Sequence, residues 1–69
     1  MPIYLADENR DLVIRNITGS DKIKAHLQTL GFIAGESVRV VNKVNNHVII
    51  KIKGVSMAVS MELAKRILV

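Results

Sequence analysis

The sequence predicts a small, mainly β domain with α+β elements. We expect a barrel of about five strands, one helix of about three turns and one short C-terminal helical turn. A change in hydrophobic periodicity indicates this class. Ile23, Leu27 and Leu30 repeat at helical spacing, whereas Val38 and Val40 recur at every second position, as in a strand.

Two glycines separate these patterns. Gly31 stands where the helix should end, in a left-handed conformation that glycine adopts without a Cβ penalty. Gly35 then turns the chain into the strand. A helix that leads directly into a hairpin is typical of a small barrel, and an ordinary α+β connection is the alternative.

Composition favours binding over catalysis. With 69 residues, the chain is expected to form one domain over residues 1–69. Apolar residues make up 49% of a chain too short to bury them all, so some apolar surface should remain exposed. The formal net charge of +4 suits an acidic protein surface, nucleic acid or lipid headgroups. Without cysteine, a long apolar stretch or a signal peptide, a cytoplasmic location is expected.

Short β-rich segments and polar turns fill the rest of the chain. Ser20 is expected to cap the central helix and Ser60 the short C-terminal one. Gly54 should turn the chain between two strands, and Ala64 should lie against the sheet. The other expected segments are a packed arm or strand over Met1–Ala6, a polar turn over Asp7–Asp11, a β-rich segment over Leu12–Ile17, and strands over Met57–Val59 and Ile67–Val69.

The hairpin that follows Gly35 has two apolar sets whose register can be argued. The sets are Val38, Val40 and Val44 in one strand, and Val48, Ile50 and Ile52 in the other. Both sets face the core only if a three-residue loop, Asn45–His47, pairs Val44 with Val48 and Val40 with Ile52. We therefore expect this loop in place of a two-residue Asn45-Asn46 turn.

This register leaves a basic outer face with two apolar residues in it. The face should carry Arg39 opposite Lys53, Val41 opposite Lys51, and Lys43 opposite Ile49. An apolar centre with a charged rim is typical of a protein-binding patch, so this face and the Phe32-Ile33 turn are the candidate partner-binding residues. A neighbouring strand, the N-terminal arm or a second subunit covering Val41 and Ile49 is the alternative.

No catalytic, cofactor or metal site is predicted. The chain has no phosphate-binding glycine loop and no nucleophile with an adjacent base, so we expect no enzyme activity. His26, on the helix, and His47, in the hairpin loop, are too isolated to predict a metal site. Nucleic-acid binding by a small basic barrel is an alternative, disfavoured because Tyr4 and Phe32 are the only aromatic residues. A small metal carrier is disfavoured by the same shortage of ligands.

Two segments resemble the FeoA family of bacterial ferrous-iron transport. Leu27–Val38 is similar to that family's Leu-x-x-Leu-Gly-[Leu/Phe/Met]-x-Pro-Gly-x-x-Val segment, and Lys53–Val69 to its ending, in which a Gly-x-x-[Leu/Met]-Ala-[Leu/Val] strand precedes a short helix. Residues that match these motifs are Leu27, Leu30, Gly31, Gly35, Gly54, Ala58 and Ala64. Ala34 replaces the usual proline, and His26 stands where an arginine commonly precedes the first leucine.

The resemblance implies an SH3-like barrel and a partner. That partner is the membrane ferrous-iron transporter FeoB, with its cytoplasmic GTPase region as the docking site. The chain would then be a cytoplasmic accessory protein, held at the inner membrane through FeoB, with a homo-oligomer as an open possibility. Because the same domain type occurs in metal-dependent repressors, a metal-responsive regulatory module is a further alternative.

Overall fold

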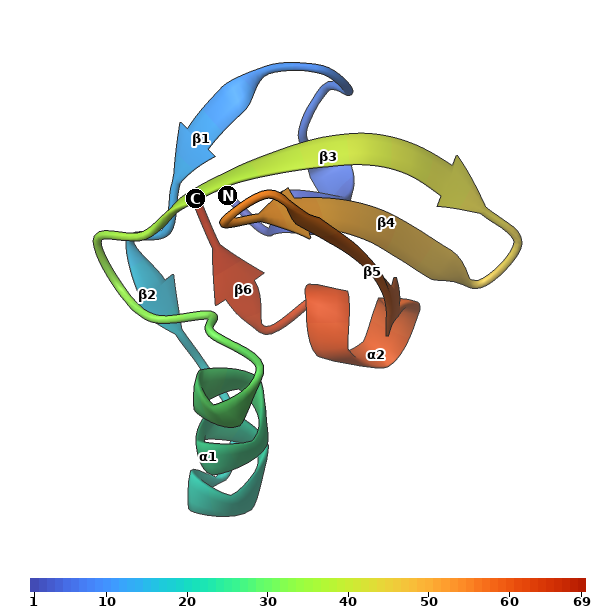
Figure 1. Cartoon of the computed structure of the whole chain (residues 1–69). Coiled ribbons are helices and arrows are strands. Elements are labelled where there is room, and N and C mark those ends of the chain that lie inside the picture. Colours follow the sequence, from blue (N-terminus) through green and yellow to red (C-terminus); the bar gives the residue numbers. More distant parts are fainter.

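The computed structural model describes residues 1–69 and confirms the mainly β class. A four-stranded antiparallel sheet has the order β1 (Asp11–Val13), β3 (Ser37–Val44), β4 (His47–Ile52) and β5 (Val55–Ser60). A second sheet pairs β2 (Asn16–Ile17) with β6 (Ile67–Leu68). Figure 1 shows the curved larger sheet over the smaller one, with helix α1 (Asp21–Thr29) projecting below. The strands number six, and the two sheets do not close into one barrel.

The β3–β4 hairpin differs from the expected register. Its loop is the two-residue Asn45-Asn46 turn, and Val44 pairs with His47, so the prediction of a three-residue loop was wrong. Asn45 has a left-handed φ of 52°, which asparagine tolerates. The register then shifts between Val40 and Asn42, which makes Val41 the extra residue of a β-bulge.

This bulge restores the alternation that the two-residue turn would break. Beyond it, Val38 pairs with Ile52 and Val40 with Ile50, and all four side chains are buried. Val44 lies on the other side of the bulge and is 44% exposed, so it is not the core residue that its spacing predicted. One extra residue therefore lets Val38, Val40 and the whole apolar set of β4 face the core, whereas Val44 at the hairpin tip does not.

The core contains 13 buried residues, all of them hydrophobic. Strands β3, β4 and β5 contribute six of them, and the others come from the N-terminus, the β1–β2 connection, α1, the α1–β3 loop and the C-terminal segment. In chain order they are Ile3, Ala6, Ile14, Leu27, Phe32, Val38, Val40, Val48, Ile50, Ile52, Val59, Ala64 and Ile67. A single apolar interior thus connects both sheets.

Helix α1 begins and ends as its sequence predicts. The Ser20 hydroxyl accepts a hydrogen bond from the Ile23 N–H at 3.2 Å. At the other end, Gly31 has φ 101° and its N–H donates to the Gln28 carbonyl, while the Phe32 N–H donates to the Leu27 carbonyl at 3.0 Å. This pair of bonds is the Schellman motif, in which the residue after the glycine packs against the helix. The helix has nine residues, about two and a half turns.

Both ends of the chain are paired with the rest of the fold. Met1–Ala6 forms a 3₁₀ turn, η1 (Ile3–Leu5), with Ile3 and Ala6 buried, whereas an arm or strand was expected. The expected Leu12–Ile17 segment is divided between β1 and β2. At the C-terminus, β6 pairs with β2, and the Val69 N–H donates to the Met1 carbonyl at 2.8 Å.

Helix α2 (Met61–Ala64) is the short C-terminal turn that the sequence predicts. The Ser60 hydroxyl accepts from the Leu63 N–H at 3.3 Å, and Ala64 is fully buried. The remaining turn, Lys53-Gly54, joins β4 to β5 with both residues at positive φ, which confirms the role of Gly54. Neither helix has the length and hydropathy required to cross a bilayer.

Candidate protein-binding surfaces

The outer face of the hairpin is narrower than the sequence predicts. We define it as Arg39, Val41, Ile49 and Lys51. Arg39 lies opposite Lys51, not Lys53, and Ile49 faces Asn42. Lys43 pairs with the buried Val48 and so leaves this face, while Lys53 lies in the β4–β5 turn. Val41 and Ile49 are half-buried, so the apolar centre exists but is partly covered.

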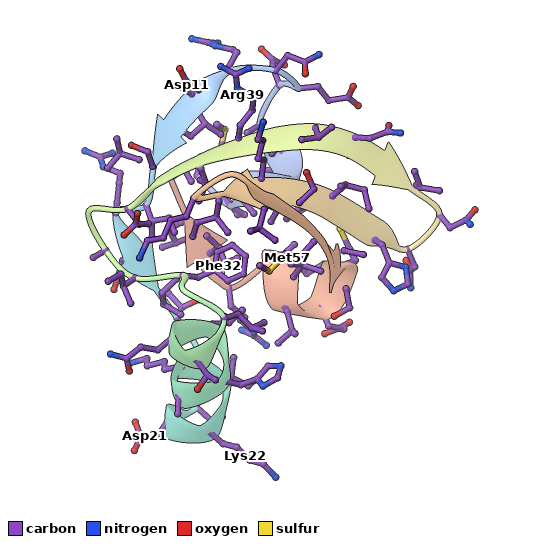
Figure 2. The ribbon with its side chains drawn as sticks, in the orientation of Figure 1. Asp11, Asp21, Lys22, Phe32, Arg39 and Met57 are labelled. Carbon is purple, nitrogen blue, oxygen red and sulfur yellow. The ribbon has the colours of Figure 1, made fainter.

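Ion pairs neutralise part of this surface. Asp11 of β1 accepts two hydrogen bonds from the Arg39 guanidinium through one carboxylate oxygen, at 3.0 Å from Nε and 2.8 Å from Nη2. Figure 2 shows these two side chains together at the outer edge of the sheet. Lys53 lies 3.8 Å from Glu36, whereas Lys51 has no acidic partner. The unpaired cation of the outer hairpin face is therefore Lys51 alone.

The surface beside α1 is more apolar. A groove of about 270 Å³ runs between β2, α1 and the α1–β3 loop. We call it the helix groove. Ile33 is 41% exposed at this groove, and Lys24 and Gln28 of α1 form its polar side. The full lining is Asn16, Ile17, Lys24, Gln28, Phe32, Ile33 and Ala34.

Of the Phe32-Ile33 turn, only Ile33 presents its side chain to solvent. The Phe32 side chain is fully buried, and Figure 2 shows its ring within the body of the molecule. The Schellman geometry explains this burial, because it packs the residue after the glycine onto the helix at Leu27. The expectation that Phe32 contacts a partner is corrected to a role in the core.

Helix α1 makes little use of the core. Leu27 is its only fully buried residue, although Ile23, Leu27 and Leu30 share helical spacing. Leu30 is 36% exposed, and Asp21 and Lys22 extend into solvent at the far end of the helix (Figure 2). Of the residues that carry the family resemblance, Leu30 and Ala58 are thus exposed, whereas Leu27 and Ala64 are buried. Helix α1 thus packs on the core through Leu27 and the partly buried Ile23, and the apolar surface at Leu30 is available for another protein.

The two histidines do not join a cluster of metal-ligating side chains. No cluster of three or more His, Cys, Asp or Glu side chains occurs. His26 lies on α1, and His47 is the first residue of β4, not a loop residue as expected. Both histidines are exposed. The candidate protein-binding surfaces are the helix groove and the outer hairpin face, and each combines apolar residues with a lysine.

This arrangement is that of a small β domain with two sheets and a helix at one end. The FeoA domain model matches residues 1–69, the whole of the chain. The protein thus belongs to the FeoA domain family, as the resemblance in its sequence indicates. No curated protein sequence matches the chain.

Solved structures share the same fold. The chain is similar to an iron uptake regulatory protein (FeoA) at 24% identity and a TM-score of 0.88, covering 97% of this chain and 91% of that one. It is similar at 24% identity and a TM-score of 0.84 to Stenotrophomonas maltophilia FeoA complexed with zinc, covering 99% and 87%. A FeoA-like protein from Clostridium acetobutylicum gives 16% identity and a TM-score of 0.87, covering 99% and 81%. The second is described as a prokaryotic SH3 domain protein, which agrees with the expected SH3-like fold.

A tight metal site does not fit the residues of this chain. Zinc is held by three or four nitrogen, sulfur or carboxylate ligands, and no such group comes together here. We expect calorimetry with Zn²⁺ or Fe²⁺ to show no one-to-one binding tighter than about 1 μM. Tighter binding that disappears in the His26→Ala/His47→Ala double variant would contradict this prediction.

Proposed function

We propose that this protein is an accessory component of bacterial ferrous-iron uptake that binds the cytoplasmic GTPase region of the FeoB transporter. Membership of the FeoA family supports the assignment to iron transport. The description of Stenotrophomonas maltophilia FeoA as a candidate ferrous iron transport activating factor supports it as well. The protein acts by binding, at the cytoplasmic side of the inner membrane, and modulates the activity or assembly of the transporter.

One observation carries the proposal that this function is exerted through a protein interface. Helix α1 has one fully buried residue in nine, Ile33 is exposed at the helix groove beside it, and Leu30 is exposed at the end of the helix. Burying such apolar surface contributes about 25 cal/mol per Å² to association. The helix groove is therefore the proposed centre of the interface, and the outer hairpin face is a second contact.

Lysines at the two surfaces have a different role from the apolar residues. Lys24 lies at the helix groove and Lys51 on the outer hairpin face, and neither forms an ion pair within the chain. Exposed charges at the rim of an interface chiefly accelerate association, whereas apolar contacts at its centre slow dissociation. The two kinds of residue should therefore affect different rate constants.

The test is to measure association and dissociation with the purified GTPase region of FeoB. Ile33→Ser should raise the dissociation rate about fivefold to tenfold through lost apolar burial. Val41→Ser/Ile49→Ser tests the outer hairpin face in the same way. Lys24→Gln and Lys51→Gln should lower the association rate and its salt dependence.

Val13→Ser provides the matched control, because Val13 is 54% exposed and belongs to neither surface. Its rates should stay within about twofold of the parent. Circular dichroism confirms that each variant is folded. If the parent shows no binding, the partner is wrong. If it binds but folded Ile33 and Val41/Ile49 variants match it, the partner stands and these surfaces are not the interface.

A further inference from the structure

The outer edge of β5 has no neighbouring strand, and none of the features that usually block a free edge is present along it. It terminates the order β1-β3-β4-β5 and runs for six residues, Val55–Ser60, without a charge, a proline or a bulge. A free edge presents unpaired backbone groups, and proteins commonly block it with a charged residue, a proline or a bulge. The opposite edge differs, because β1 has only three residues and carries the Asp11–Arg39 ion pair. Only β5 therefore offers a long, neutral edge for pairing.

The register shows which backbone groups are free. Ile52 and Val55 flank the two-residue turn and form a hydrogen-bonded pair, so bonded and non-bonded pairs alternate along β4 and β5. The N–H and C=O groups of Ser56 and Ala58 consequently point away from β4. No turn or loop of the chain bonds to them, and both residues are exposed. They form a short, open backbone ladder.

We propose that this edge pairs with β5 of a second copy of the chain, antiparallel about a two-fold axis at Met57. In that arrangement Ser56 of each copy faces Ala58 of the other, and each pair exchanges N–H···O=C bonds in both directions. The free groups of the two copies thus match in register, and the contact is closed. This interface uses the free edge of β5, whereas other residues form the helix groove and the outer hairpin face.

Side chains along β5 suit this pairing. The inner-face residues are Val55, Met57 and Val59, which places Val55 of one copy beside Val59 of the other. Val55 is 57% exposed in the single chain, whereas Val59 is buried. Pairing would therefore place apolar side chains of the second copy beside the exposed Val55. On the outer face, Ser56 and Ala58 are small enough for a second strand to approach. No charged residue lies within the paired strands.

Charges at the two ends of β5 are complementary. Lys53 precedes the strand, and Glu62 follows it in the first turn of α2. Antiparallel pairing brings the start of one β5 beside the end of the other, so Lys53 of each copy lies near Glu62 of its partner. Lys53 has only a 3.8 Å contact with Glu36 within its own chain, and Glu62 has no ion pair. This complementarity selects a second copy as the occupant of the edge.

Sedimentation of the 69-residue chain between about 10 μM and about 1 mM tests the proposal, because an interface this small gives a weak complex. The average mass should rise from 7.6 kDa toward twice that value. Ala58→Lys places a charge near the two-fold axis and should weaken dimerisation about tenfold or more. Val44→Lys is the matched control. Val44 is exposed at the hairpin tip, so this substitution adds the same charge at a position away from β5.

Charge reversal identifies the register. Lys53→Glu and Glu62→Lys should each weaken the dimer about threefold to tenfold, and the double variant should recover to within about twofold of the parent. These changes leave the β4–β5 ladder intact, and circular dichroism verifies the fold. A monomer at the highest concentration overturns the proposal. So does a dimer that neither Ala58→Lys nor charge reversal affects, or a mass that rises beyond the dimer.

Discussion

Replacing Phe32 with alanine should lower the free energy of unfolding by about 3–5 kcal/mol. The Phe32 ring is fully buried, and the Schellman bond from its N–H to the Leu27 carbonyl holds it against the base of α1. A chain of 69 residues has a total stability of roughly 3–10 kcal/mol. The variant should therefore lose a large share of the stability of the chain, and at the lower end of this range it should be unfolded at 25 °C. Urea titration followed by circular dichroism measures the change.

Leu30→Ala is the control for this substitution. Leu30 lies two positions earlier in the same motif but is 36% exposed. It should cost less than about 1 kcal/mol, because little apolar area leaves the core. Equal losses of unfolding free energy for the two variants would mean that the apolar residues of the helix, and not Phe32, hold α1 against the core. A loss below about 1 kcal/mol for Phe32→Ala would contradict its place in the core.

Local signals predicted the elements that depend on neighbouring residues. The caps Ser20 and Ser60, the turn at Gly54 and the helix end at Gly31 all occur as expected. Each of these features is decided by backbone hydrogen bonds within a few residues, so a short window of sequence contains the necessary information.

The hairpin register could not be obtained in the same way. Two rules conflicted there: Asn45-Asn46 favours a two-residue turn, whereas the alternation of the valines favours an odd loop. The prediction followed the alternation and lengthened the loop, but the structure keeps the short turn and inserts Val41 as a bulge. A bulge has no strong local signature in this sequence, and it requires knowledge of the partner strand.

The candidate binding residues depended on that register, so they changed with it. Because Lys43 pairs with Val48 and not with Ile49, it does not belong to the outer hairpin face. The Asp11–Arg39 pair joins residues 28 positions apart and follows from the pairing of β1 with β3, which no periodicity indicated. The burial of Phe32 could have been predicted from the sequence, because a hydrophobic residue after the glycine that ends a helix usually packs on that helix. The open edge of β5 became visible only with the strand order.

Gly31→Val should reduce the free energy of unfolding by about 1–3 kcal/mol. Space is not the cause, because a Cβ at Gly31 would meet only the Ile52 Cδ1 atom, at an ordinary contact distance of 3.6 Å. The cost comes from φ 101°, a backbone conformation in which a β-branched residue is strained. Relief of that strain would break the hydrogen bonds from the Gly31 and Phe32 N–H groups that end the helix.

Gly31→Asn separates backbone strain from side-chain bulk. Asparagine tolerates positive φ better than valine does, so this variant should retain more stability than Gly31→Val. Both should be measured by urea unfolding against the parent. A change below about 0.3 kcal/mol for Gly31→Val would show that the helix can end without a left-handed residue. Equal losses for valine and asparagine would assign the cost to the added side chain. A larger loss of unfolding free energy for Gly31→Val would assign the cost to backbone strain at Gly31. The turn at this residue places Phe32 in the core and leaves Ile33 at the helix groove.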